Sequence, residues 1–289
     1  MFGFFRKKGA PEPPKNTGAD NGVEAKMKAL NEAFMRCYAP YSLPDFKYTP
    51  RDIGDIPLDD VPDSEKLRIL AHEVDMRRRD DPYVGAKLAG QEIYANLLEM
   101  LKTEKGVHIE SLLAVIGAAG GYECMYGIMN TFYNIIDELG LTVAAGGALS
   151  IFVAETKDGG KFLFGDRVGN EFCLFYMNAA KTSEPPIDAL KPLSERAAQT
   201  AGTPEYWKTP FDEKVGNTPK ELSDMFCGKF NVTYKTFCLY PQERMIAWSI
   251  AAQLAVEQAS KVISPDGFKT AMSIIAEYGW RTSHFIGEK

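Results

Sequence analysis

The sequence predicts an α+β fold that is predominantly helical and carries a small antiparallel β element, a hairpin near residues 148–165, in the middle of the chain. Long stretches repeat apolar residues at the i, i+3, i+4, i+7 spacing of a buried helix face. The one clear β signal is a β-branched and aromatic run before a turn that contains Asp158 and Gly159. The composition, 45% hydrophobic and 25% charged over 289 residues, is that of a globular protein.

The N-terminal stretch differs from the rest of the chain. Residues 1–21 are rich in Pro, Gly and Asn and lack an apolar period, so we expect a disordered segment there. Residues 22–289 are expected to form a single mainly helical globular domain, with the loop-rich stretch 182–217 as a candidate sub-boundary. The first helix is predicted over 23–37.

Two further helices are predicted on either side of Pro82, which lacks the backbone N–H that a helix interior needs. The first begins at Asp63 or Ser64 and the second runs over 83–102. Between them, Arg77 lies four residues from both Glu73 and Asp81, the spacing of ion pairs on a helix surface. We therefore interpret the arginines at 77–79 as a solvated helix face.

The segment 107–148 is apolar and contains a glycine cluster, Gly117, Gly120 and Gly121. One interpretation is a strand, a phosphate-binding turn and a helix. It is weakened because the dinucleotide-binding pattern G-x-G-x-x-G is absent. The apolar residues before the cluster follow the helical period, so we favour two buried helices that pack closely through these glycines, or a helix break near Gly120.

A hairpin is predicted from 148–156 and 161–164, joined by a turn at 157–160 in which Asp-Gly tolerates positive φ. Two strands alone are marginal in water, so this ribbon must pack on helices or find further strands. A second turn is expected at 165–169. The next segment is predicted as a helix from Asn170 to Ala180, with a third strand as the alternative.

The C-terminal half is predicted as mainly helical, with a short helix at 194–200. Thr218, Pro219 and Glu221 form a capping-box helix start. Residues 229–240 alternate well enough to predict a strand or extended piece. Long helices are expected at 242–263 and 265–278.

Charge and cysteine content restrict the classes of function. The net charge is −6, so the chain lacks the basic surface expected of a nucleic-acid-binding protein. Five cysteines form no C-x-x-C pair, which favours reduced thiols and a cytoplasmic location. No transmembrane segment is predicted, because the best apolar run, 247–255, is shorter than the ~20 residues that a span needs.

The sequence matches no strong catalytic or metal-binding pattern. His72 and Glu73 begin the zinc motif H-E-x-x-H, but Met76 replaces its second histidine. A nucleophile elbow and a Walker phosphate loop are also absent. We therefore predict neither a metal nor a cofactor, and whether the protein is an enzyme stays open.

Six polar residues are candidates for ligand binding. Asp166 and Arg167 are expected in a glycine-flanked turn, where a carboxylate and a guanidinium could contact a ligand. His108 and Glu110 precede the glycine-rich segment. Arg281 and His284 combine a cation and a titratable base near the C-terminus.

The leading functional hypothesis is a cytoplasmic, non-catalytic protein that binds a small molecule or a partner protein. Abundant aromatic and small residues in the core segments are compatible with a homo-oligomer. One alternative is a nucleotide- or phosphate-binding enzyme that uses Gly117, Gly120 and Gly121. Another is peripheral membrane association through an aromatic and basic N-terminal segment formed by Phe2, Phe4, Phe5, Arg6, Lys7 and Lys8.

Overall fold

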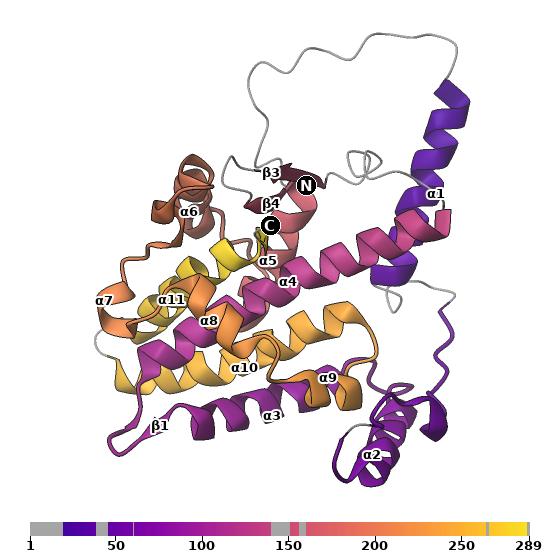
Figure 1. Ribbon diagram of the computed structural model, residues 1–289, viewed down its shortest axis with the longest axis horizontal. Coiled ribbons are helices and arrows are strands. Elements are labelled where there is room, and N and C mark those ends of the chain that lie inside the picture. The colour runs from indigo at the N-terminus through magenta and orange to yellow at the C-terminus, as the bar shows by residue number, and fades with distance from the viewer. Residues whose placement is uncertain are drawn as a thin grey trace.

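The computed structural model describes residues 20–38, 46–59, 61–139, 151–155, 160–263 and 266–287. The predicted fold class is confirmed, because long helices dominate these residues and two small antiparallel sheets accompany them (Figure 1). The first half contains α1 (Asp20–Tyr38), η2 (Ile53–Asp55), α2 (Ser64–Arg77), α3 (Val84–Met100), β1 (Lys102–Thr103), β2 (Gly106–Val107) and α4 (Ile109–Leu139). The second half contains β3 (Phe152–Glu155), β4 (Lys161–Phe164), α5 (Asp166–Ala180), α6 (Ile187–Thr200), η4 (Pro204–Trp207), α7 (Asp212–Val215), α8 (Pro219–Phe226), α9 (Asn231–Phe237), α10 (Pro241–Val262), α11 (Gly267–Thr282) and β5 (Phe285–Gly287).

Helix α4 crosses the whole molecule and packs against α1, α8, α10 and α11 (Figure 1). The strand–turn–helix interpretation of this segment is wrong, because Ile109–Leu139 is one continuous helix. The expected division into two helices, or a break near Gly120, is wrong as well, because the described residues of the segment after His108 form this one helix. The expected close packing is confirmed at these glycines.

The three glycines let α4 approach α5 and α11. A Cβ at Gly121 would overlap the carbonyl oxygen of Gly279 on α11, and one at Gly117 would lie 2.8 Å from the carbonyl oxygen of Ile275. A Cβ at Gly120 would lie 2.5 Å from the Phe175 ring on α5. Any larger residue at these positions must push the helices apart.

The predicted hairpin is confirmed, since β3 and β4 pair antiparallel with Phe152 opposite Phe164. Of its predicted turn at 157–160, residues 157–159 lie outside the described residues. The ribbon gains a third strand that the sequence analysis missed, because β5 near the C-terminus pairs antiparallel with β4. The sheet therefore joins the middle of the chain to its C-terminal segment.

Several predicted elements need correction. Asp166 and Arg167 do not lie in a turn, because α5 begins at Asp166, and the third-strand alternative for this segment is wrong. Residues 229–240 do not form a strand, because α9 occupies most of them. The capping box is confirmed, since the Thr218 hydroxyl accepts a hydrogen bond from the Glu221 amide, and the Glu221 carboxylate accepts one from the Thr218 amide.

The longest apolar segment of the described chain lies in α4 and not at the run 247–255 in α10. Residues Ile109–Ile135 of α4 are long and apolar enough to cross a membrane, and they are the one such segment among the described residues. However, 89% of that helix's most apolar window is buried inside the protein. Such burial is typical of a core helix and agrees with the prediction that the chain has no transmembrane segment.

A buried ion network ties α2 to the start of α10. We define the ion network as Arg51, Asp75, Arg78 and Glu243. The guanidinium of Arg78 lies 3.2 Å from Asp75 Oδ1 and 2.5 Å from Glu243 Oε1, and all three side chains are fully buried. Arg51 Nε donates to Asp75 Oδ2 at 2.7 Å. The expectation that the arginines at 77–79 form a solvated face is therefore wrong for Arg78.

Candidate functional site

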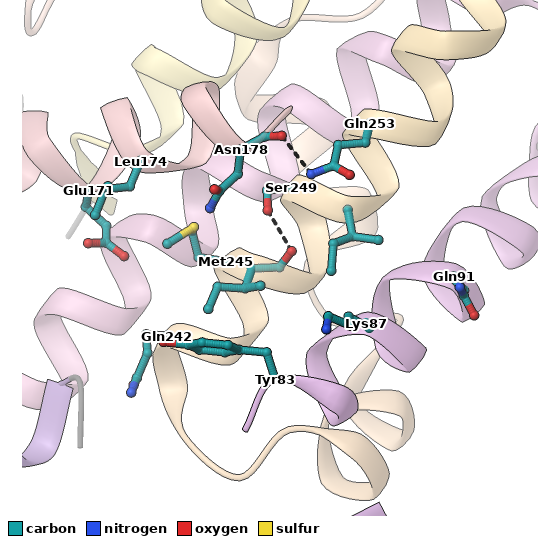
Figure 2. Close-up of a pocket in the computed structure, with 12 residues that line it drawn as sticks. Tyr83, Lys87, Gln91, Glu171, Leu174, Asn178, Gln242, Met245, Ser249 and Gln253 are labelled. Atoms are coloured by element: carbon teal, nitrogen blue, oxygen red, sulfur yellow. Dashed lines mark hydrogen bonds between the residues drawn. The ribbon is translucent and has the colours of Figure 1, made fainter. Parts of the chain in front are cut away.

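A groove of about 670 Å³ lies among α3, α5 and α10 (Figure 2). Each helix contributes residues at helical spacing, so that one stripe of each faces the groove. From α3 and the residue before it come Tyr83, Lys87 and Gln91, from α5 come Glu171, Leu174 and Asn178, and from α10 come Gln242, Met245, Ile246, Ser249, Ile250 and Gln253.

Close helix contacts hold these three walls in place. A Cβ at Gly90 of α3 would lie 2.5 Å from the carbonyl oxygen of Ala247 and 2.7 Å from Cβ of Ile250, both on α10. At one end of the groove, Gln253 Nε2 of α10 donates to the carbonyl oxygen of Asn178 on α5 at 2.7 Å (Figure 2). The walls are therefore fixed on both sides of α10.

The carboxyl group of Glu171 has a strongly raised pKa. Its side chain belongs to the buried face of α5 and the residue is only 4% exposed. No hydrogen bond or ion pair joins its carboxyl group to another described residue. Burial alone raises the pKa of Glu171 to about 8, because removal from water disfavours the charged form. At neutral pH the group is therefore mainly protonated and can donate one hydrogen bond.

Gln242 in the first turn of α10 is the second unusual group. The residue is 6% exposed, and neither its amide oxygen nor its amide nitrogen has a hydrogen-bond partner among the described residues. A buried polar group left without a partner costs about 1–3 kcal/mol. Figure 2 shows Gln242 and Glu171 apart from Lys87 and Gln91, which belong to the opposite wall on α3.

Two other polar side chains of the groove, Lys87 and Ser249, are engaged with the protein. Lys87 Nζ lies 2.6 Å from Asp81 Oδ2. Ser249 Oγ donates to the carbonyl oxygen of Ile246 at 2.7 Å. The apolar lining comes from Leu174, Met245, Ile246 and Ile250. The arrangement combines an apolar surface with two buried polar groups that have no partner in the described chain.

A further buried carboxyl, Glu123 on α4, has a different environment and does not line the groove. Its Oε2 atom lies 3.8 Å from Arg244 Nη1. Burial raises the pKa of Glu123 to about 7, opposed by the charge of Arg244 and a hydrogen bond from Tyr234. Glu123 thus has an internal cation, which Glu171 lacks.

The structure places Asp166 and Arg167 in the first turn of α5, outside the groove. Asp166 is exposed. Arg167 Nη2 donates to Asn31 Oδ1 at 2.7 Å, and its guanidinium stacks 4.3 Å from the centre of the Phe34 ring. Burial lowers the pKa of Arg167. These contacts attach α1 to α5, while a ligand-binding role for the pair stays a prediction.

His108 and Glu110 lie together at the start of α4. His108 Nε2 is 3.3 Å from Glu110 Oε2, and His108 Nδ1 is 2.7 Å from Ser111 Oγ. His108 is exposed, and neither residue lines the groove. The structure therefore brings these two candidates together, apart from Glu171 and Gln242.

Arg281 and His284 are buried at the C-terminal end of α11. Arg281 Nε donates to the carbonyl oxygen of Tyr206 at 2.6 Å, and its Nη1 lies 2.6 Å from Glu277 Oε2. His284 Nδ1 lies 2.9 Å from the carbonyl oxygen of Trp280, and burial lowers the pKa of His284 to about 4. Both residues hold the C-terminal segment on the core, and their ligand-binding role is untested.

The alternative phosphate site at Gly117, Gly120 and Gly121 lacks the helix N-terminus that it would need. A phosphate cradle needs free backbone N–H groups at a helix N-terminus. These glycines lie in the interior of α4, against α5 and α11. Over the described ranges, no group of three or more His, Cys, Asp or Glu side chains is placed to hold a metal ion.

Glu171 and Gln242 were both missed as candidates from the sequence. The signal was available at Glu171, which shares the apolar face of α5 with Val168, Phe172 and Phe175 at helical spacing. A charged residue inside an apolar stripe is rarely buried without a partner. Gln242 begins a comparable stripe on α10.

No protein-family description matches the chain, and neither curated proteins nor solved structures contain a significant match.

Proposed function

We propose that the protein binds a small organic molecule in the groove among α3, α5 and α10, without transforming it chemically. One observation carries this proposal: Glu171 and Gln242 line the groove and are more than nine-tenths buried, no hydrogen bond or charge of the described chain acts on the Glu171 carboxyl group, and neither side-chain amide atom of Gln242 has a hydrogen-bond partner there. A ligand that bonded to both would recover free energy that the protein alone leaves unused.

The size and chemistry of the groove support this proposal. Its volume of about 670 Å³ lies within the ~300–1,000 Å³ range of small-molecule sites. Such sites combine apolar walls with a few polar groups that orient the ligand. Leu174, Met245 and Ile250 supply the walls here.

The lining residues favour binding over catalysis. Nucleophilic catalysis needs a hydroxyl, thiol or amine bonded to a general base. The one serine of the lining, Ser249, donates to a backbone carbonyl, and the one lysine, Lys87, is paired with Asp81. Glu171 is the one carboxyl group in the lining, so the paired acid and base of many hydrolases are not provided there.

The test is a thermal-shift screen of small organic molecules on the full chain and on two tryptophan variants. Leu174→Trp fills the groove from α5, whereas Ile69→Trp adds the same ring to the exposed surface of α2. A ligand at 100 times its dissociation constant adds about 2.7 kcal/mol to the free energy of unfolding. We expect hits on the parent chain and on Ile69→Trp, and their loss in Leu174→Trp.

Two results would contradict the proposal. One is a screen without any hit that raises the melting temperature of the parent chain. The other is a set of hits that stabilise Leu174→Trp as much as Ile69→Trp, since those ligands would bind elsewhere.

Location, assembly and membrane association stay predictions. Cys124, Cys173, Cys227 and Cys238 carry free thiols, which supports a reducing compartment and the proposed cytoplasmic location. The N-terminal aromatic and basic segment lies outside the described residues. Liposome sedimentation with and without residues 1–10 tests it, and self-association is tested by sedimentation velocity.

A further inference from the structure

We propose that the ligand of the groove is a small organic amine, bound as its cation, with its ammonium group on the carboxylate of Glu171 and the amide oxygen of Gln242 and its hydrocarbon part along α10. This inference rests on the proposed function, because it names the chemical class of ligand for the same groove.

The number of hydrogen-bonding atoms supports an ammonium group. A primary ammonium ion has three donors and no acceptor. Glu171 contributes two carboxylate oxygens and Gln242 one amide oxygen, and none of the three is used by another described residue. The remaining Gln242 nitrogen is a donor for a second polar group of the ligand or for water.

The charges around the groove also favour a cation. A buried carboxylate is stable only when it is paired with a cation and hydrogen-bonded. The one basic side chain of the lining, Lys87, is bonded to Asp81, and α10 contributes only uncharged side chains to the lining. A cation that lets Glu171 ionise must therefore come with the ligand. An anionic ligand would bring no counter-ion and would favour the protonated form of Glu171.

The apolar wall accounts for the rest of the ligand. Met245, Ile246 and Ile250 lie on α10 beyond Gln242, at spacings that keep them on one face. An alkyl or aryl substituent on the amine would cover them. A metal ion would leave this wall unused and would find a single carboxylate as its anionic ligand.

Proton release gives this inference a specific signature. Burial raises the pKa of Glu171 to about 8, and no charged group on α3, α4, α10 or α11 contributes to the shift. The other titratable groups of the lining are Tyr83, which directly precedes α3, and Lys87 on α3. In the free protein at pH 7 the carboxyl group therefore holds its proton. An alkylammonium ion favours the carboxylate, so that the carboxyl group and the ammonium ion give an ion pair and one proton is released.

The experiment compares three probes with the same hydrocarbon chain on the full protein: n-hexylamine, 1-hexanol and hexanoate. Isothermal titration calorimetry at pH 7 gives each affinity. We expect hexylamine to bind at least about tenfold more tightly than hexanol, the ratio that 1.4 kcal/mol of preferential interaction produces. Hexanoate is expected to bind most weakly.

Proton release is measured by repeating the hexylamine titration in buffers of different ionisation enthalpy. About nine-tenths of a proton per ligand is expected at pH 7 and about one-tenth at pH 9, because a group with the pKa of Glu171 is mostly neutral at the first pH and mostly ionised at the second. E171Q should abolish the release, weaken hexylamine about tenfold and leave hexanol unchanged. Q242L, which removes the third acceptor, should weaken hexylamine while the release persists.

Each failure has its own meaning. If hexylamine and hexanol bind equally and E171Q affects neither, the amine assignment is overturned while the groove proposal stands. If a lysine-containing peptide binds more tightly than hexylamine and displaces it, the ammonium group that pairs with Glu171 comes from a lysine of a partner protein. The small-molecule assignment is then overturned. If none of the probes binds and the tryptophan variants respond alike in the screen, both proposals fail.

Discussion

Gln242 and Glu243 are neighbours in the first turn of α10 and are both almost completely buried, but the protein uses them differently. Glu243 accepts hydrogen bonds with both oxygens, from Arg78 Nη1 at 2.5 Å and from the Leu239 amide at 2.8 Å. Gln242 uses neither of its amide atoms within the described chain. One side of α10 is therefore closed by the ion network, while the other faces the groove.

The same contrast holds between Glu243 and Glu171. Both are buried glutamates, but Glu243 meets a guanidinium and Glu171 meets no described charge. Burying a carboxylate is costly in either case, and pairing it with a cation offsets the cost. The polar groups of the ion network bond to one another within the fold, and we propose that those of the groove bond to a ligand.

The largest effect is expected from Arg78→Met, which removes the central cation of the ion network. Asp75 and Glu243 would then be buried without their shared partner, and losing one member of a buried pair costs about 3–5 kcal/mol. Urea denaturation measures the change in the free energy of unfolding. The matched control, Lys261→Met, removes an exposed pair with Glu257 and should cost less than about 1 kcal/mol. Equal losses in the two variants would contradict a stabilising ion network.

Glu171→Gln should stabilise the protein, and more so at high pH. The unfolded chain ionises this carboxyl near pH 4.5, whereas the folded chain holds its proton until about pH 8, so the free energy of unfolding falls as pH rises through that interval. The shift sets an upper bound of about 5 kcal/mol, and we expect roughly 3 kcal/mol at pH 9 because water in the groove relieves part of the cost of burial.

The measurement for Glu171→Gln is urea denaturation at pH 5 and pH 9. The difference between variant and parent should be small at pH 5 and large at pH 9. Glu257→Gln, at an exposed glutamate, controls for the loss of one charge. Parallel profiles for Glu171→Gln and the parent would mean that the carboxyl is already neutralised by the protein, and the contrast with Glu243 would disappear.

Much of the fold could be predicted from the sequence because it depends on local periodicity. The stripe formed by Ile109, Leu112, Leu113 and Ile116 predicted a helix. These residues lie on α4 and pack in or against the hydrophobic core. Helix α9 was wrongly predicted as a strand, because β-branched and aromatic residues suggested alternation. Its buried residues, Thr233, Tyr234, Thr236 and Phe237, instead follow helical spacing, so tertiary packing overrode the local preference.

The groove could not be predicted in the same way, because it depends on contacts between distant segments. Lys87, Glu171 and Gln242 come from three helices far apart in the sequence, and only the packing of α3 and α5 on α10 brings them to one groove. The absence of a partner for Glu171 likewise depends on every neighbouring helix. The same limit applies to Arg78, whose burial follows from the position of Glu243.

The packing of α4 against its neighbours can be compared within that one helix through Gly121→Ala and Gly127→Ala. At Gly121 the added methyl group would overlap the carbonyl oxygen of Gly279, and such overpacking costs about 1–3 kcal/mol. At Gly127 the nearest atoms belong to Pro241 at 3.9 Å, so the better helix propensity of alanine should stabilise by up to about 1 kcal/mol. Thermal denaturation should show melting temperatures that shift in opposite directions. A gain from Gly121→Ala would contradict the close contact of α4 with α11.

The smallest effect is expected from Gln242→Leu, and it separates the two sides of α10 most directly. Leucine has a similar size and removes two buried polar atoms that make no hydrogen bond within the described chain, so the free energy of unfolding should rise by about 1 kcal/mol, the lower end of the cost of an unpartnered polar group. Glu243→Leu, one position along, should destabilise strongly because it leaves Arg78 without Glu243. If Gln242→Leu instead cost as much as Glu243→Leu, Gln242 would be part of the folding core. A small gain in stability combined with weaker ligand binding would support a role of Gln242 in the groove, because a residue that only filled space would not affect ligand binding.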